Sequence, residues 1–74
     1  MPRLPALAPA EIIRVLEQRG FVFDRAKGSH RIYVHPDSKR RAVVPFHRHD
    51  LPKGACLEIL RQAGISKEEL AELL

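Results

Sequence analysis

The sequence predicts an α+β domain in which a helix, three antiparallel strands, a second helix and a short last helix follow one another over residues 1–74. Two observations predict this class. Apolar residues recur at helical spacing in residues 9–19 and 52–63, whereas the chain between them holds three short segments rich in strand-forming residues, of which residues 29–35 alternate well between two faces. A chain of 74 residues is long enough for one small domain, so we expect it to form a single unit.

The first helix is expected over residues 9–19. Pro9 suits the first helical position, because the N–H that proline lacks would have no partner there. An apolar stripe marks the side of this helix that faces the core, and it consists of Ile12, Ile13, Val15 and Leu16. Gly20 favours the left-handed conformation that ends a helix, while Ala8 lacks the side-chain oxygen that commonly caps a helix start.

Three strands are expected over residues 21–25, 29–35 and 41–47, with a turn at residues 36–39, where proline, aspartate and serine gather. Pro45 has no N–H to donate to a neighbouring strand. The third strand is therefore predicted to lie at an edge of the sheet or to end at this proline.

Alternation along the strands predicts which residues face the helices, because successive side chains of a strand point to opposite faces. In the second strand these residues are His30, Ile32 and Val34, and in the third they are Ala42, Val44 and Phe46. Two helices can cover only one face of the sheet. The other face is expected to stay open and to carry Arg31, Tyr33, His35 and Arg41.

The second helix is expected over residues 52–63, with Gly64 as its end. A serine followed three residues later by glutamate, Ser66 and Glu69, forms the pattern of a capping box. This pattern predicts a short last helix that continues to Leu74.

Positive charge is concentrated in the middle of the chain. The whole chain has 13 Lys and Arg against 9 Asp and Glu, a net charge of +4. The stretch from Arg25 to Lys53 holds eight of the cations, only two of the anions and all four histidines. A basic segment between nearly neutral ends indicates a surface for a polyanion, and the alternative is a solvated basic face without a partner.

Several classes of protein are excluded by composition. No apolar run is long enough to cross a membrane, and the first residues lack the apolar core of a secretory signal. Cys56 is the single cysteine, so a disulfide scaffold and a zinc ribbon are excluded. We therefore expect a cytoplasmic protein.

The first candidate site is the segment from Lys27 to Tyr33. Gly28 allows close approach of the backbone to a ligand, and the hydroxyl of Ser29 and the imidazole of His30 follow at the start of a strand. Imidazole titrates near neutral pH, which suits proton transfer in phosphodiester cleavage. A structural histidine at the end of the core is the alternative for His30.

Two other chemistries have weaker support. Ser29 and His30 are neighbours on a strand and point to opposite faces, so they do not form a nucleophile and base pair. His35, His47 and His49 could gather around a metal, but no carboxylate pair or second cysteine completes the ligand set. We expect no metal and no other cofactor.

The second candidate site is the segment from Pro45 to Gly54, which leads into the second helix. Helix starts attract phosphate through their free N–H groups, and three basic residues near this start would add to that attraction: Arg48, His49 and Lys53. A polar loop before a helix is the alternative. Tyr33 and Phe46 could stack on an RNA base or could simply pack in the protein.

These segments together resemble the HicA toxin family of YcfA-like mRNA interferases. The resemblance is carried by Phe21 to Tyr33 with Lys-Gly-Ser-His inside it, by Val43 to His47, and by Leu51 to Ser66. The chain departs from the family pattern at two places, where members usually have Ser-Gly instead of Ala8 and Pro9, and Thr-Leu instead of Ala55 and Cys56.

The resemblance implies a fold similar to double-stranded-RNA-binding domains and an enzyme that cleaves mRNA without a metal. It also implies a toxin of a type II toxin–antitoxin system that a HicB antitoxin inhibits, with His30 as the catalytic residue. The residues predicted to bind RNA are Lys27, Gly28, Ser29, Arg31, Tyr33, Arg41, His47, Arg48 and Lys53. The alternative functions are an RNA-binding module of the same fold without catalysis, and a domain that binds only protein.

Overall fold

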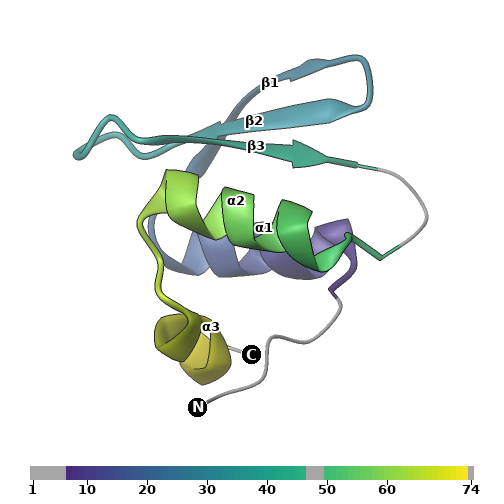
Figure 1. Ribbon diagram of the computed structural model, residues 1–74. Coiled ribbons are helices and arrows are strands. Elements are labelled where there is room, and N and C mark those ends of the chain that lie inside the picture. Colours follow the sequence, from purple (N-terminus) through teal and green to yellow (C-terminus); the bar gives the residue numbers. More distant parts are fainter. Residues whose placement is uncertain (1–6, 47–49, 74) are drawn as a thin grey trace.

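The computed structural model describes residues 7–46 and 50–73 and has six elements in the order α-β-β-β-α-α (Figure 1). The elements are α1 (Pro9–Gln18), β1 (Val22–Lys27), β2 (His30–Val34), β3 (Arg41–Pro45), α2 (Lys53–Ala63) and α3 (Lys67–Leu73). This confirms the predicted α+β class and the predicted order of elements.

The three strands form one antiparallel sheet in the order β1-β2-β3. Figure 1 shows α1 and α2 on the same side of this sheet, with α3 farther from it, so the other face of the sheet is open. The structure therefore confirms two helices on one face. Among the described residues, no helix is long and apolar enough to cross a membrane.

The core lies between the sheet and the two long helices. Ile12 and Leu16 of α1, Val44 of β3 and Ile59 of α2 are almost completely buried in one cluster. Leu7 joins the cluster, and its carbonyl accepts a hydrogen bond from the N–H of Leu51 at 2.8 Å. The chain before α1 is thus fixed to the chain before α2.

The predicted helix ends are confirmed. Gly20 and Gly64 follow α1 and α2 with φ of 93° and 74°, values that favour glycine. Ser66 and Glu69 form the predicted capping box, since the Ser66 hydroxyl accepts the Glu69 N–H at 3.1 Å and the Glu69 carboxylate accepts the Ser66 N–H at 3.3 Å. Leu70 of α3 is buried and attaches this helix to the core.

The strand faces of β2 are the reverse of those predicted. Tyr33 pairs with Ala42 and Arg31 pairs with Val44, and paired residues of antiparallel strands lie on one face. Because Ala42, Val44 and Tyr33 all belong to the core cluster, Arg31 and Tyr33 lie on the helix side. His30 and its alternate neighbours Ile32 and Val34 therefore lie on the open face, which corrects the sequence-based assignment.

His35 also lies on the helix side, against the prediction. Its ring meets the ring of Phe21 edge-on, with 5.2 Å between the centroids. Its Nδ1 accepts the N–H groups of Asp37 and Ser38 at 3.2 Å each, which closes the turn between β2 and β3. A Cβ added to Gly20 would lie 2.9 Å from the His35 Nε2, so glycine is required there for space as well as for its φ.

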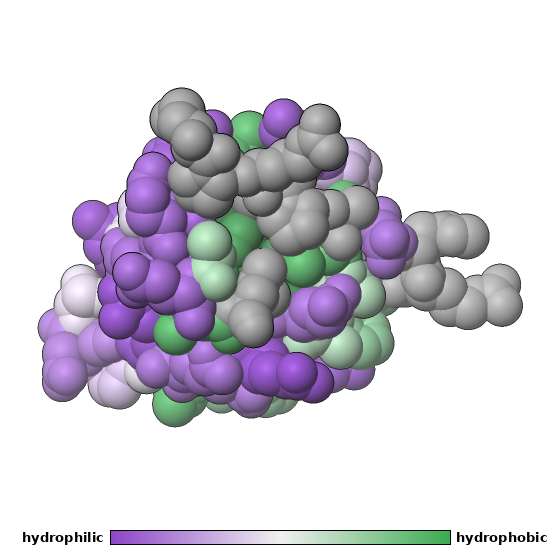
Figure 2. Space-filling view, turned by 90° about the horizontal axis from the view of Figure 1, so that it is seen from below, coloured by the Kyte–Doolittle hydropathy of each residue, from purple (hydrophilic) through white to green (hydrophobic). Residues whose placement is uncertain are grey.

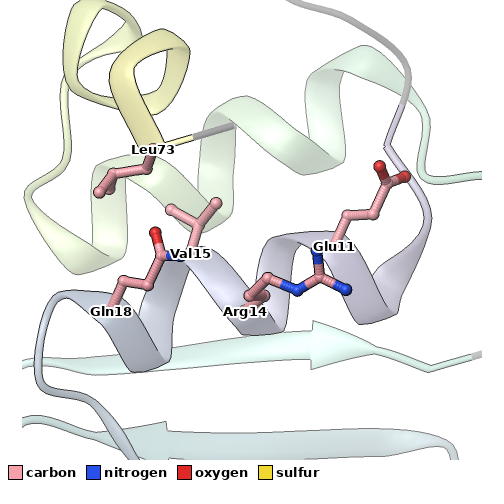
Figure 3. Close-up of a pocket in the computed structure, with 5 residues that line it drawn as sticks. All are labelled: Glu11, Arg14, Val15, Gln18 and Leu73. Carbon is pink, nitrogen blue, oxygen red and sulfur yellow. The ribbon is translucent and has the colours of Figure 1, made fainter.

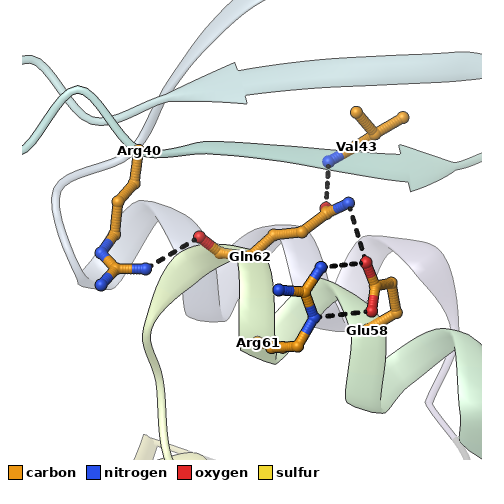
Figure 4. Close-up of polar contacts among 5 residues, drawn as sticks. All are labelled: Arg40, Val43, Glu58, Arg61 and Gln62. Atoms are coloured by element: carbon orange, nitrogen blue, oxygen red, sulfur yellow. Dashed lines mark hydrogen bonds and ion pairs between the residues drawn. The ribbon is translucent and has the colours of Figure 1, made fainter.

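Strand β3 is an edge strand that ends at Pro45, as predicted. The Val43 N–H points away from the sheet and donates to the Gln62 side-chain oxygen at 3.0 Å (Figure 4). The Gln62 side-chain amide in turn donates to the Glu58 carboxylate at 3.4 Å. The backbone carbonyl of Gln62 accepts a hydrogen bond from the Arg40 guanidinium at 3.4 Å. Side chains of α2 thus occupy the outer edge of β3.

Candidate nucleic-acid interface

The tight turn between β1 and β2 is the centre of the candidate interface. Lys27 and His30 pair across the hairpin, so Gly28 and Ser29 form a two-residue loop. Gly28 has φ of 60° and occupies the first central position, which is the glycine position of a type II′ turn. A Cβ added to Gly28 would meet no atom of residues 7–46 and 50–73 within 4 Å, so this part of the chain leaves the backbone of the turn open to a ligand.

His30 is exposed and lies on the open face at the end of β2. Lys27 is its neighbour on one side and Pro45 on the other. Within residues 7–46 and 50–73, no hydrogen bond fixes its imidazole. This position excludes a histidine buried in the core and leaves the ring beside a lysine, accessible to a ligand.

Arg31 lies on the other face and is half-buried. Its guanidinium carbon is 3.8 Å from the centroid of the Phe46 ring, which is 36% exposed. The N–H of Phe46 donates to the Ser29 carbonyl at 2.6 Å, so the chain leaving β3 is attached to the hairpin turn. The turn therefore has a histidine and a lysine on one face and a stacked arginine on the other.

Helix α2 begins at the same end of the molecule. Figure 1 shows the β1–β2 turn, the end of β3 and the start of α2 all at one end. Lys53 is the first residue of α2 and is exposed, and the first turn of this helix has no acidic residue. The positive charges of Lys27, Arg31 and Lys53 thus lie at the same end of the molecule.

The structure separates Arg41 and Tyr33 from this group. Arg41 is on the open face, as predicted, but it pairs with Val34, four residues from His30 and about 13 Å along the strand. Tyr33 is only 4% exposed, and its ring is part of the core. The predicted place of Tyr33 on the open face is wrong, because the register places its ring under the helices, and of the two alternatives for this ring the structure shows packing in the protein.

Two of the predicted RNA-binding residues, His47 and Arg48, lie outside the described residues, as does His49. Within the described residues, no three His, Cys, Asp or Glu side chains are placed to share a metal ion.

Sequence reasoning missed Arg25. The register shifts between Phe23 and Arg25, and this irregularity places Asp24 as an extra residue in β1. Arg25 then pairs with Ile32 and lies on the open face, two residues from His30 and about 7 Å along the strand. No signal in the sequence marks the extra residue, so simple alternation gives the wrong face.

A separate hollow of about 310 Å³ lies between α1 and α3 and is lined by Glu11, Arg14, Val15, Gln18 and Leu73 (Figure 3). It contains none of the predicted site residues. Figure 2 shows the molecule from below the view of Figure 1, and on the coloured part of this face hydrophilic residues predominate with smaller apolar areas between them. The hollow is therefore distinct from the hairpin turn.

A family model described as the HicA toxin of bacterial toxin–antitoxin systems matches residues 9–65. The match includes the sheet, both long helices and every residue of the candidate interface. A search of the curated proteins finds no match to the chain. Because the family model covers most of the sequence, the chain belongs to the HicA toxin family.

Proposed function

We propose that the protein is an endoribonuclease toxin that cleaves mRNA at the β1–β2 turn, with His30 as the catalytic residue. The observation that carries the proposal is the exposed imidazole at this turn, beside Lys27, in a chain of the HicA toxin family. An mRNA substrate places this activity in the cytoplasm.

The RNA backbone binds at the end of the molecule where the cations gather. Lys27, Arg31 and Lys53 neutralise phosphates, while the open backbone of Gly28 and Ser29 allows the strand to approach closely. The N-terminal turn of α2 adds free N–H groups to this end. Arg25 and Arg41 extend the positive surface along the open face.

The reaction is an attack of the ribose 2′-oxygen on the neighbouring phosphorus. The bond between the 2′-oxygen and phosphorus forms, the bond to the 5′-oxygen breaks, and the products are a 2′,3′-cyclic phosphate and a 5′-hydroxyl. One group accepts the proton of the 2′-hydroxyl and another donates a proton to the leaving 5′-oxygen. His30 carries one of these two transfers, and the charge of Lys27 stabilises the phosphorane.

Cleavage by single-residue variants tests this mechanism. Purified protein is expected to shorten a long RNA in the presence of EDTA, and His30→Ala to abolish the cleavage. His47→Ala is measured beside it, because His47 is one of the two histidines in the segment from Pro45 to Gly54 and is the alternative catalytic residue if His30 is not required. Full cleavage by a folded His30→Ala protein would remove His30 from the mechanism, and RNA binding without any wild-type cleavage would establish a binding module instead.

The phosphate contacts are tested by the salt dependence of RNA binding. Each neutralised phosphate contributes about −0.7 to the slope of log affinity against log salt for single strands. Lys53→Ala and Arg31→Ala are each expected to weaken binding and to flatten this slope. An unchanged slope in both variants would place the RNA elsewhere on the protein.

A HicB-type antitoxin is proposed to inhibit the toxin by covering the turn. Carboxylates on this partner would complement the excess of cations between Arg25 and Lys53, and such complementarity speeds and orients association. Amide exchange on the complex is expected to show protection in residues 27–33. Protection confined to α3 would contradict this placement.

A further inference from the structure

The contact between Arg31 and Phe46 supports an inference about how RNA binds, and this inference rests on the proposed function. We propose that these two side chains form a stacking site for one unpaired nucleobase next to the cleaved phosphate. The substrate class that follows is single-stranded RNA, because a paired base inside a duplex cannot reach such a site.

The stacking site is preorganised by the sheet. Arg31 is held in β2 by its pairing with Val44, and Phe46 is held by its N–H bond to the Ser29 carbonyl at 2.6 Å. The guanidinium carbon lies 3.8 Å from the ring centroid, so the planar group rests against the ring. A base that stacks here meets side chains that are already ordered, so binding costs little further conformational entropy.

The guanidinium keeps its hydrogen-bonding capacity for a ligand. Among the described residues, no carboxylate lies within ion-pair distance of Arg31. A planar guanidinium stacked on an aromatic ring is a surface on which nucleobases stack in RNA recognition. Its N–H groups can donate at the same time to a base or to a phosphate.

The other aromatic residues do not offer such a site. Phe21 and Tyr33 are buried in the core. Phe23 is 53% exposed, but it pairs with Tyr33, three residues from His30 and about 10 Å along the strand. Phe46 is therefore the exposed ring that lies at the hairpin turn.

The two faces of the sheet are joined at its end by the Gly28–Ser29 turn. His30 lies on the open face, while Arg31 and Phe46 lie on the helix side of the same end. An RNA strand that crosses this end places a phosphate at His30 and the adjoining base on the arginine. The small, open turn gives the strand room to cross.

The test measures binding of a short single-stranded RNA that carries 2-aminopurine and is 2′-O-methylated to prevent cleavage. Phe46→Leu removes the ring, and Arg31→Lys keeps the charge but removes the planar group. Each is expected to lose about tenfold in affinity and most of the fluorescence quenching. The matched controls Phe23→Leu and Arg14→Lys are expected to bind like the wild type.

The outcomes separate this proposal from the proposed function. The stacking site is refuted if folded Phe46→Leu and Arg31→Lys both keep the affinity and the fluorescence quenching of the wild type. It is also refuted if a duplex binds more tightly than the single strand. In either case RNA cleavage by the wild type would still support the proposed function. A wild type that neither binds nor cleaves RNA would overturn both. If Phe46→Leu does not fold, Arg31→Lys decides.

Discussion

Replacing the tyrosine and the histidine of β2 by alanine tests the two faces of the sheet directly. Tyr33 is 4% exposed and packs in the core, so Tyr33→Ala leaves a cavity and is expected to cost about 3–5 kcal/mol. This is a large part of the roughly 5–15 kcal/mol that stabilises a typical domain. His30 is exposed and has no partner among the described residues, so His30→Ala is expected to stay within about 0.5 kcal/mol of the wild type.

Thermal and urea unfolding followed by far-UV circular dichroism measure this difference. For a chain of this size, the melting temperature changes by about 4–8 °C per kcal/mol. Tyr33→Ala should therefore melt at least about 12 °C below the wild type, and His30→Ala within about 4 °C of it. Tyr33→Phe, which keeps the ring, should lose about 1 kcal/mol or less. Equal losses in the two alanine variants would refute the assignment of faces.

Three further predictions concern other parts of the fold. Gly20→Ala combines a φ of 93° with a Cβ only 2.9 Å from an imidazole nitrogen and should destabilise the fold by about 1–3 kcal/mol in the same unfolding assay. Gly54→Ala lies in α2, where a Cβ would meet no described residue, and it should stabilise the fold by about 0.5 kcal/mol. The hydrogen-bonded Arg61 guanidinium lowers the pKa of the Glu58 carboxyl. The ionised Glu58 carboxylate therefore stabilises the fold at pH values above its pKa in the unfolded state, and this stabilisation is lost as the pH falls through its pKa in the folded state. An NMR titration should show this lowered pKa, and Arg61→Ala should raise it toward the ordinary value, because the hydrogen bond from Arg61 is the largest cause of the shift. Burial raises the pKa of the Cys56 thiol, so iodoacetamide should label it slowly in the folded protein and rapidly in urea; rapid labelling of folded protein would contradict its burial.

The elements and their ends were predictable because their signals are local. A glycine after each long helix, a serine and glutamate three residues apart, and a proline that ends an edge strand each act within a few residues. The same residues form the same motifs in the structure. Helix and strand positions follow from such signals without knowledge of the tertiary contacts.

The strand faces were not predictable in the same way, because they depend on pairing between distant residues. In β2, Ile32 and Val34 are apolar on one face, and Tyr33 is large and buried on the other. The pairing of Tyr33 with Ala42 determines which face of β2 is covered by the helices, because Ala42 has a small side chain and belongs to the core. In β1 an extra residue at Asp24 reverses the alternation, which sequence periodicity cannot reveal.

The candidate site was predicted as a segment but not as an arrangement in space. The Lys-Gly-Ser-His run marked the turn, and Lys53 marked the start of α2. The stacking of Arg31 on Phe46 follows from register, because both lie on the face of Val44. The reversal of faces also moved His30 from the covered side to the open side, which strengthens the case for catalysis.

The position of the hairpin turn outside the core has a consequence for the evolution of a toxin. Ser29 and His30 are exposed and their side chains contribute nothing to the buried cluster, so substitutions at these two positions leave the rest of the fold intact. Gly28 differs from them, because its φ of 60° favours glycine. Under the proposed function, selection against a harmful toxin can remove its activity at this turn in a single step and retain a folded protein. Escape through a change at the turn would leave a folded but inactive protein, whereas escape through a change in the core would remove the protein altogether.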